Sequence, residues 1–560
     1  HEDLAGHVAC GPADRLDERL VGPQEALLVR VEDRHQRDFA GKIFMSANTI
    51  TANARIDGRE ELIAKLHGKL TLKSSPSDAE LILNAYEAWG EDCVKHLIGD
   101  FAFAIWDNRL QRFFCARDHF GVKPFFFTHI GDSFKFSSTL NELRLDPGVS
   151  DALNEVAIGD YLLFGLNQDL STTTFKDIQR LPPGHSLTVT KESIKMRRYW
   201  SPGGSSEVRF RDPHSYVERF SELLSRAVQD RLRTDRVSVS MSGGLDSTSV
   251  AAIACNQADL QACTVVYDHL IPDQERHYST AAAQHLGIPI NYVVADRYSL
   301  FDEQVPGDMD QPEPFLISPF TGQFNDLLRL CAAFGPVALT GYDGDAFMSE
   351  PQPSRFKIRS RLKRLLGKRT PDAVLPEWID ESFAKRTNLQ ERLKQSSIHP
   401  ASPANPIWTA LFEGYDPGAT KLPLEVRHPF IDVRLVEYLL PISIVPWRVN
   451  KHILRLAMKD RLPATLINRP KTPLAGDPAL QLARHASVRW LDSFEVNPQL
   501  RNFVDLNLRR PLADEQTSDG LWASLRVFAL NYWLTNSQPS ARRTTENQID
   551  KSRAYQTAIA

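Results

Sequence analysis

A glycine-rich turn near the middle of the chain restricts the fold more than any other feature. Residues 242–247, SGGLDS, directly follow the apolar run VSVSM and open the helix-like run STSVAAIAC. A turn between a strand and a helix directs backbone N–H groups and the positive helix N-terminus toward an anion. The pattern therefore predicts a phosphate-binding loop, although an ordinary strand-to-helix turn is the alternative.

The side chains of this turn suit a nucleoside triphosphate with magnesium. The hydroxyls of Ser242 and Ser247 can donate hydrogen bonds to phosphate oxygens, and the carboxylate of Asp246 can hold Mg²⁺. The turn lacks the GxxxxGK[ST] pattern of a Walker A loop and contains no lysine. The residues expected to bind ATP here are Ser240, Ser242, Gly243, Gly244, Asp246 and Ser247.

The N-terminal part of the chain reads as short strands. Between residues 50 and 200, aromatic and β-branched runs such as FAFAIWD, RFFCARD, KPFFFTHI and FKFSS are separated by polar turns. This pattern predicts antiparallel hairpins. Two helical patterns precede them, REELIAKLHGKL and SDAELILNAYEAWG, and Ser77 with Glu80 has the spacing of a capping box.

The pattern changes after the short linker-like segment SPGGSSE. The helical run SYVERFSELLSRAVQDRL, the strand RVSVSM, the SGGLDS turn and the strand QACTVVYD alternate, which predicts a parallel sheet. We expect an N-terminal antiparallel sandwich over residues 1–203. A doubly wound parallel-sheet domain is expected over residues 204–535, followed by a disordered polar tail over residues 536–560.

Composition excludes several classes of protein. The net charge of −4 offers no basic surface for nucleic acid, and no apolar run is long enough to span a membrane. The six cysteines form no CxxC pair, so a zinc site is not expected, and Cys255 reads as a buried reduced thiol. We expect a cytoplasmic protein without a signal peptide. Because the sequence begins at His1, we also expect that N-terminal residues are missing.

Several ordered motifs resemble the asparagine synthetase family. SGGLDS is similar to the pyrophosphate-binding loop of ATP pyrophosphatases, and GDFAFAIWDNRLQRFFCARDHFGVKPFFF resembles part of the family's glutaminase-type domain, an Ntn-type fold. RHPFIDVRLVEYLLP, KHILRLAM and LPATLINRPK follow in the order of its synthetase domain. The resemblance implies an amide-forming ligase that uses ATP and Mg²⁺, adenylates a carboxylate, and releases AMP and pyrophosphate.

The resemblance also implies further site residues. The family's second loop, SGxGxDE, corresponds to residues 340–346, which read TGYDGDA, so that Asp345 falls on the second magnesium-binding aspartate and Gly341 lies near the nucleotide. Two carboxylates on magnesium suit a leaving pyrophosphate that accumulates negative charge. A plain surface turn is the alternative for this loop.

Two lysines and two valines complete the implied site. Lys471 falls on the lysine that stabilises the transition state in similar enzymes, and Lys451 matches another recurrent family lysine. A solvated surface position is the alternative for both. Val265 and Val266 are either adenine contacts or core residues.

Two departures from the family concern its ammonia supply. The family's glutaminase acts through an N-terminal cysteine, whereas Cys10 is internal here, and the alternative is that residues missing before His1 carry that cysteine. Where glutaminases carry an NGEIYN-like segment, residues 53–57 read NARID. We therefore expect a glutaminase-like domain that no longer produces ammonia.

A third departure concerns the amine that attacks the acyl group. Tyr342 stands where asparagine synthetases have an acidic residue, and β-lactam synthetase pairs a tyrosine there with a glutamate as a general base. Counting back from His428 selects Glu413 as that glutamate, with a solvated helix residue as the alternative.

The amine is therefore expected on the same substrate molecule. We favour a lasso-peptide macrocyclase, which joins the N-terminal amine of a precursor peptide to an Asp or Glu side chain. An asparagine synthetase, using glutamine or ammonia, and a β-lactam-type synthetase are the alternatives. The basic residues 357–369 are either a contact for the peptide or a solvated helix face. The expected partners are a precursor peptide and, in addition, a leader-peptide protease, with no nucleic acid or membrane.

Overall fold

The computed structural model describes most of the chain between residues 43 and 536. The described ranges are 43–45 (backbone only), 48–70, 72–203, 207–302, 312–314, 318–342, 344–348, 374–395, 405–469, 476–485, 488, 491, 493–509 and 511–536. Lys471, Cys10, residues 357–369 and the tail after residue 536 lie outside them.

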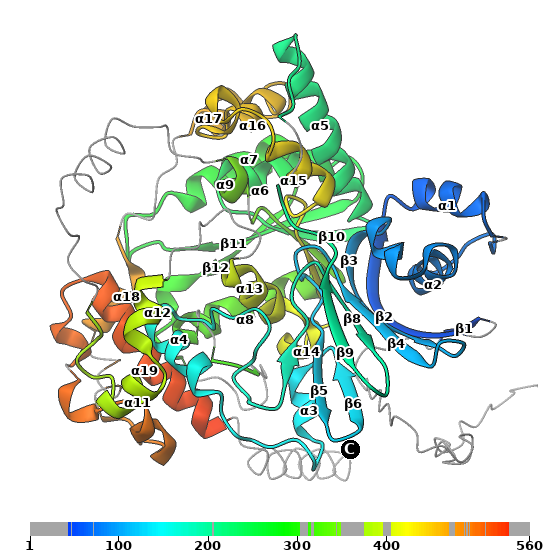
Figure 1. Ribbon diagram of the computed structural model, residues 1–560. Coiled ribbons are helices and arrows are strands. Elements are labelled where there is room, and N and C mark those ends of the chain that lie inside the picture. Colours follow the sequence, from blue (N-terminus) through cyan, green and yellow to red (C-terminus); the bar gives the residue numbers. More distant parts are fainter. Residues whose placement is uncertain are drawn as a thin grey trace, which may run out of the picture.

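Two antiparallel sheets form the N-terminal part (Figure 1). The larger has the order β1-β2-β3-β4-β8-β9, with bounds Ile43–Met45, Asn48–Asp57, Ile98–Asp107, Arg112–Arg117, His185–Val189 and Ile194–Arg198. The smaller has the order β6-β5-β7, with bounds Ser133–Ser137, Phe126–Ile130 and Gln179–Arg180. The hairpins β3–β4 and β5–β6 confirm the turns predicted from the sequence.

Alternation along β3 explains the sandwich. Phe101 and Phe103 pack with the core beneath helices α1 (Arg59–His67) and α2 (Asp78–Trp89). Ala102, between them in sequence, faces the core shared with the smaller sheet. Successive side chains of a strand point to opposite faces, so one strand serves both cores. Helix α2 begins with the predicted capping box of Ser77 and Glu80.

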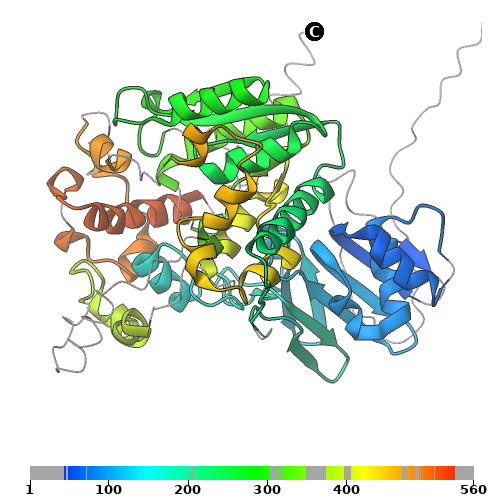
Figure 2. The same cartoon turned by 90° about the horizontal axis from the view of Figure 1, so that it is seen from above.

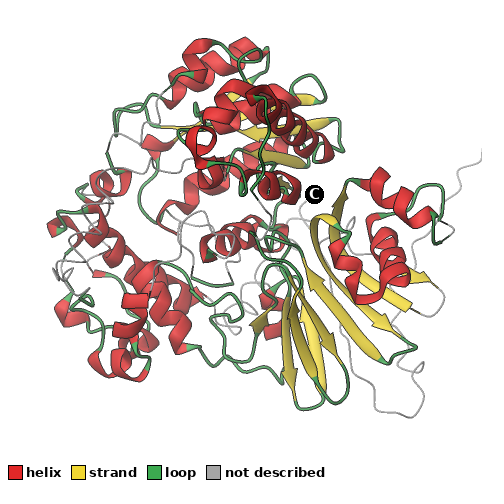
Figure 3. Ribbon diagram, turned by 45° about the horizontal axis from the view of Figure 1, so that its top comes forward, coloured by secondary structure: helices red, strands yellow, loops and turns green. Residues whose placement is uncertain are grey.

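A five-stranded parallel sheet forms the centre of the C-terminal part (Figure 3). Its order is β12-β11-β10-β13-β14, with bounds Ile290–Val294, Asp259–Val266, Arg236–Ser240, Val337–Thr340 and Glu425–Arg427. Every pairing between neighbouring strands is parallel. The predicted fold class, an antiparallel sandwich followed by a parallel α/β sheet, is confirmed.

Helices cover both faces of this sheet (Figure 1). One face packs against α5, α6, α7, α15 and α16, with bounds Pro213–Asp230, Leu245–Ala254, Glu275–Leu286, Val433–Leu439 and His452–Ala457. The other packs against α8 (Thr321–Phe334) and the end of α13 (Pro406–Tyr415). Strands buried on both faces explain the continuous apolar runs VSVSM and CTVV.

The strand order reverses between β10 and β13. The chain passes from β10 outward to β11 and β12, then returns to place β13 on the opposite side of β10. The crevice beyond the carboxyl ends of two such strands is where open α/β sheets bind ligands. Residues 242–247 follow β10, and residues 341–346 follow β13.

The two parts share a hydrophobic core. Helix α4 (Glu155–Phe164) of the N-terminal part packs in one cluster with α11 (Glu381–Arg386), α12 (Leu389–Gln395) and α19 (Ser518–Asn536). Figure 2 shows this helical region beside the parallel-sheet domain. The remaining described α-helices are α3 (Leu140–Arg144), α9 (Gly344–Met348), α14 (Pro417–Thr420), α17 (Ala464–Ile467) and α18 (Pro478–Ala483).

Two further observations concern the expectations from composition. None of the described helices has the length and apolar character needed to cross a bilayer. The five described cysteines are free thiols, and four of them, Cys93, Cys115, Cys263 and Cys331, are buried. Cys255 was expected to be buried but is only half-buried, because it ends α6 at the edge of the core.

Candidate active site

The loops after β10 and β13 touch each other directly. A Cβ atom built on Gly341 would lie 2.3 Å from the backbone nitrogen of Ser247, and one built on Gly344 would lie 2.5 Å from Cγ of Asp246. The Gly341 contact is with backbone and leaves no space for a side chain, whereas at Gly344 a side chain would displace the Asp246 carboxylate. The structure therefore brings the two predicted loops together at the topological switch point.

The loop after β10 leaves the start of α6 available to an anion. Gly244 occupies the N-cap position, and no side chain caps the helix. Ser242 and Ser247 hold the turn, with their hydroxyl oxygens 3.1 Å apart, and the Gly244 N–H donates to Ser242 Oγ at 3.2 Å. An uncapped helix N-terminus of this kind can accept a phosphate group.

Lys451 connects the two predicted metal ligands. Its Nζ lies 2.6 Å from Oδ2 of Asp246 and 2.7 Å from Oδ1 of Asp345. Lys451 adopts a left-handed backbone conformation with φ of +56°, and its N–H donates to the carbonyl of Met348. An unfavourable conformation in a residue other than glycine indicates that the surrounding structure fixes it in place.

The pair Asp246 and Asp345 suits a magnesium ion. Mg²⁺ is commonly held in proteins by one or two carboxylates together with substrate phosphates. The ammonium group of Lys451 already places a cation against both carboxylates. Among the described residues, no group of three or more His, Cys, Asp or Glu side chains forms an independent metal site.

Arg469 and Glu275 are site residues that the sequence did not indicate. Glu275 accepts a hydrogen bond from the N–H of Gly243, and Arg469 donates to Glu275 at 2.8 Å. The Arg469 guanidinium also lies over the ring of Tyr278, 4.0 Å from its centroid. Its Nη1 is buried and has no hydrogen-bond partner in the described part of the chain. An unpaired buried guanidinium nitrogen beside the predicted phosphate-binding turn can bind a phosphate oxygen.

Tyr342 lies in the loop after β13, next to Gly341. Its side chain is 44% exposed, and its ring lies 6.0 Å from that of Tyr415 and 6.4 Å from that of His428. Thr340 is 2.8 Å from Nδ1 of His428. Burial, with nearby Arg231 and other cations, lowers the pKa of His428 to about 3, so this imidazole is neutral near pH 7.

Glu413 is neither solvated nor shown as the partner of Tyr342. It is buried, and both carboxylate oxygens accept hydrogen bonds from Arg180, at 2.8 and 2.9 Å. Arg117 donates to the same carboxylate at 3.1 Å. Both arginines belong to the N-terminal part, so this carboxylate anchors α13 across the interface. The alternative of a solvated helix residue is wrong, and the predicted dyad with Tyr342 stays a prediction.

The two valines predicted to contact adenine differ in burial. The Val266 side chain is completely buried, so the structure assigns it to the core rather than to adenine. Val265, one residue earlier on β11, is only partly buried. Ser240 ends β10 between Cys263 and Thr340 of the neighbouring strands. It therefore lies at the edge from which both loops depart.

The altered glutaminase segment is buried in an ion-pair network. Arg55 donates to Asp57 at 3.0 Å and to Asp100 at 2.7 Å. Across the interface, Arg231 lies 3.4 Å from Asp57 and 3.9 Å from Asp100. Lys123 in turn pairs with Glu425 of β14 at 3.0 Å. The side chains that replace the glutamine segment therefore connect the two parts of the molecule.

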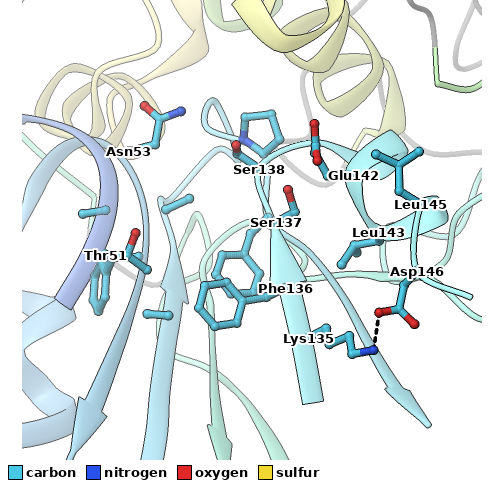
Figure 4. Close-up of a pocket in the computed structure, with 16 residues that line it drawn as sticks. Thr51, Asn53, Lys135, Phe136, Ser137, Ser138, Glu142, Leu143, Leu145 and Asp146 are labelled. Carbon is cyan, nitrogen blue, oxygen red and sulfur yellow. Dashed lines mark hydrogen bonds and ion pairs between the residues drawn. The ribbon is translucent and has the colours of Figure 1, made fainter. Parts of the chain in front are cut away.

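A separate pocket lies between the two sheets of the N-terminal part (Figure 4). Its empty space is about 940 Å³, including the part open to solvent. Asn53 of the altered segment and Ser137 and Ser138 line it, and Lys135 forms an ion pair with Asp146 at its rim. It is not formed by the loops that follow β10 and β13.

Comparison with known proteins supports the two-part organisation. A family model described as asparagine synthase matches residues 219–535, more than half of the chain. One described as a glutamine amidotransferase domain matches residues 44–200.

Two curated relatives come from Bacillus subtilis (strain 168). The chain is 28% identical over 468 residues to "Asparagine synthetase [glutamine-hydrolyzing] 3", with 76% of this chain and 75% of that protein covered. It is 28% identical over 484 residues to "Asparagine synthetase [glutamine-hydrolyzing] 2", with 76% of this chain and 62% of that protein covered.

Proposed function

This chain belongs to the asparagine synthase family and is an ATP-dependent amide-forming ligase that produces AMP and pyrophosphate, and from this we propose that it is a lasso-peptide cyclase. In this proposal the carboxylate is an Asp or Glu side chain of a precursor peptide. The amine is the N-terminus of the same peptide. The product is a macrolactam closed by an isopeptide bond.

The observation that carries the proposal is that the segment corresponding to the glutamine-binding residues lies in a buried ion-pair network. Arg55 and Asp57 are paired with each other and with Asp100 and Arg231. Side chains committed to a buried ion-pair network cannot also bind glutamine without breaking it, which is costly in a buried setting. If glutamine does not supply ammonia, the substrate is the simplest source of the amine.

Activation of the carboxylate is assigned to the loops after β10 and β13. A carboxylate oxygen of the substrate attacks the α-phosphorus of ATP, the bond to pyrophosphate breaks, and an acyl-adenylate forms. The start of α6, Arg469 and Lys451 supply positive charge to the pyrophosphate as it leaves. Magnesium held by Asp246 and Asp345 would neutralise further charge there.

Amide formation is assigned to the Tyr342 side of the site. The amine loses a proton and attacks the acyl carbon, the C–N bond forms, and the C–O bond to AMP breaks. The phenol of Tyr342 is the group proposed to receive the amine's proton, and Lys471 is proposed to stabilise the oxyanion. Closing the ring within one bound molecule would supply a high effective concentration of the amine.

The role of Glu413 in this step depends on its arginines. To accept the phenolic proton of Tyr342, the carboxylate would have to give up a hydrogen bond from Arg180 or Arg117. Positioning of α13 is therefore the role that its contacts support. Catalysis by a Tyr342/Glu413 dyad stays a prediction that was made from the sequence.

The proposal is tested by measuring pyrophosphate release from ATP with three sets of substrates. The first is aspartate with glutamine, the second is aspartate with ammonia, and the third is a pool of linear peptides that each carry a free N-terminus and one Asp or Glu. We expect pyrophosphate release only with peptides, with one water lost from the product by mass spectrometry. Asparagine formed from aspartate, without a cyclised peptide, would overturn the proposal and return the enzyme to asparagine synthesis.

A further inference from the structure

A second concave site lies between the two parts of the molecule. One wall comes from α4 and the segment that follows it, and the other from residues 312–314 and α13. Its empty space is about 600 Å³, including the part open to solvent.

The walls of this cleft combine apolar side chains with a net negative charge. Ala157, Leu166, Leu170 and Pro314 are among the apolar lining residues. Three carboxylates and one guanidinium also line it, namely Asp169, Glu313, Glu413 and Arg180. Arg180 pairs with both glutamates and Arg117 pairs with Glu413, so Asp169 is the carboxylate in excess. This excess disfavours a free anion such as aspartate and does not disfavour a neutral or basic apolar segment.

Thr409 provides independent evidence for a ligand. Its side chain is 4% exposed and lines the cleft, yet its hydroxyl has no hydrogen-bond partner in the part of the chain that the structure describes. A buried polar group without a partner is costly and usually indicates a missing ligand or water. A peptide N–H or C=O is the size and chemistry that this hydroxyl can satisfy.

The cleft adjoins the candidate active site through α13. Thr409 and Glu413 are one turn apart on this helix and both line the cleft. Tyr415, at the end of α13, packs against the ring of Tyr342. A chain lying in the cleft would therefore extend along α13 toward the loop that follows β13.

We propose that this interdomain cleft binds a non-reacting apolar segment of the peptide substrate, with Thr409 hydrogen-bonded to the peptide backbone. The inference rests on the proposed cyclase function and names the site that selects its substrate. It also gives the N-terminal part a role, because half of the cleft belongs to it. Arg180 and Arg117 hold the two walls together through Glu413.

The first test fills the cleft. Ala410 lines it, whereas Ala64 is exposed on α1, so Ala410→Trp and Ala64→Trp are matched variants. The pool of linear peptides described above is incubated with each protein, and the retained peptides are quantified by mass spectrometry. We expect Ala410→Trp to reduce retention by about tenfold. Binding of Mg-ATP, measured by titration, should change in neither variant.

The second test leaves the volume unchanged. Thr409→Val removes the hydroxyl, and Thr535→Val makes the same change at an exposed helical position. We expect a loss of roughly threefold to tenfold in peptide retention for Thr409→Val, the range for one hydrogen bond. Full retention by both Ala410→Trp and Thr409→Val would overturn the inference, as would an equal loss in their controls.

Failure of the proposed function gives a different result. Suppose that the wild-type protein retains no peptide and that aspartate alone supports pyrophosphate release. The proposed cyclase function is then wrong, and the cleft does not bind a peptide substrate. The KM for aspartate in Ala410→Trp then decides whether the cleft binds a substrate at all. A KM raised by about tenfold would keep the cleft as a substrate site, whereas an unchanged KM would show that it takes no part in substrate binding.

Discussion

Lys451 places its ammonium nitrogen 2.6 Å from the carboxylate of Asp246, a residue 205 positions earlier in the chain. The same nitrogen lies 2.7 Å from Asp345. One cation therefore holds together two carboxylates that would otherwise repel each other. This arrangement positions both predicted magnesium ligands before any metal or nucleotide is bound.

Removing this cation should make the carboxylate pair a stronger metal site. In Lys451→Met we expect free Mn²⁺, without nucleotide, to bind roughly tenfold more tightly, because two carboxylates lose their internal counter-charge. Electron paramagnetic resonance of unbound Mn²⁺ measures this directly. The exposed Lys459→Met is the control. Unchanged or weaker Mn²⁺ binding would contradict the bridging role.

Arg469 should contribute to ATP binding. Its Nη1 is buried beside Gly243 without a described partner, so Arg469→Gln removes a charged donor directed at the phosphate loop. We expect the Kd for Mg-ATP to rise by about tenfold, measured by calorimetric titration. Arg461→Gln, at an exposed position, should leave the Kd unchanged. An effect confined to the melting temperature would assign Arg469 a purely structural role.

Gly341 should not tolerate alanine. The added methyl group would lie 2.3 Å from the Ser247 nitrogen and force apart the two loops of the site. Gly341→Ala should therefore lose pyrophosphate release and destabilise the fold by about 1 to 3 kcal/mol. Gly68→Ala is the matched control, because Gly68 has a helical φ of −69° and room for a methyl group. Wild-type turnover in Gly341→Ala would be incompatible with the close approach of the loops.

Substitutions at Tyr342 and Glu413 should have different effects, one on the rate of amide formation and the other on the stability of the fold. Tyr342→Phe should keep the melting temperature and the ATP–pyrophosphate exchange of the adenylation step while slowing amide formation. Glu413→Gln removes the carboxylate that pairs with buried Arg117 and leaves Arg180 with Glu313 alone, so we expect a loss of about 3 kcal/mol in unfolding free energy. The opposite pattern, a stable Glu413→Gln variant defective only in amide formation, would favour the catalytic dyad.

Protonation of His428 should make the protein less stable as the pH falls below about 6.5. Its folded-state pKa, about 3, is below the ordinary value of 6.5, so the unfolded state takes up the proton first. This contribution is complete above pH 6.5 and is lost as the pH falls toward 3. Thermal melts between these values should show a smaller pH dependence in His428→Asn, which cannot be protonated. An identical slope in both proteins would exclude His428 as a source.

Local patterns in the sequence were sufficient for the fold class and for the strand, turn and helix around residues 242–247. The apolar run before residue 242 and the glycines after it specify a strand, a turn and a helix within a few residues of each other. The capping box at Ser77 and the hairpins of the N-terminal part are equally local. Such features depend on side-chain periodicity and backbone conformation, which a short stretch of sequence contains.

Tertiary packing alone decided which distant groups meet. The partners of Glu413 are Arg180 and Arg117, which are 233 and 296 positions away, and no spacing in the chain identifies them. Burial likewise assigned Val266 to the core although its neighbour Val265 is partly accessible. Charge pairing and burial depend on the three-dimensional arrangement of both parts of the molecule. The sequence therefore determined the elements and the residues of the two loops, and the folded structure determined how Lys451 and Arg469 meet those loops and how Glu413 anchors α13.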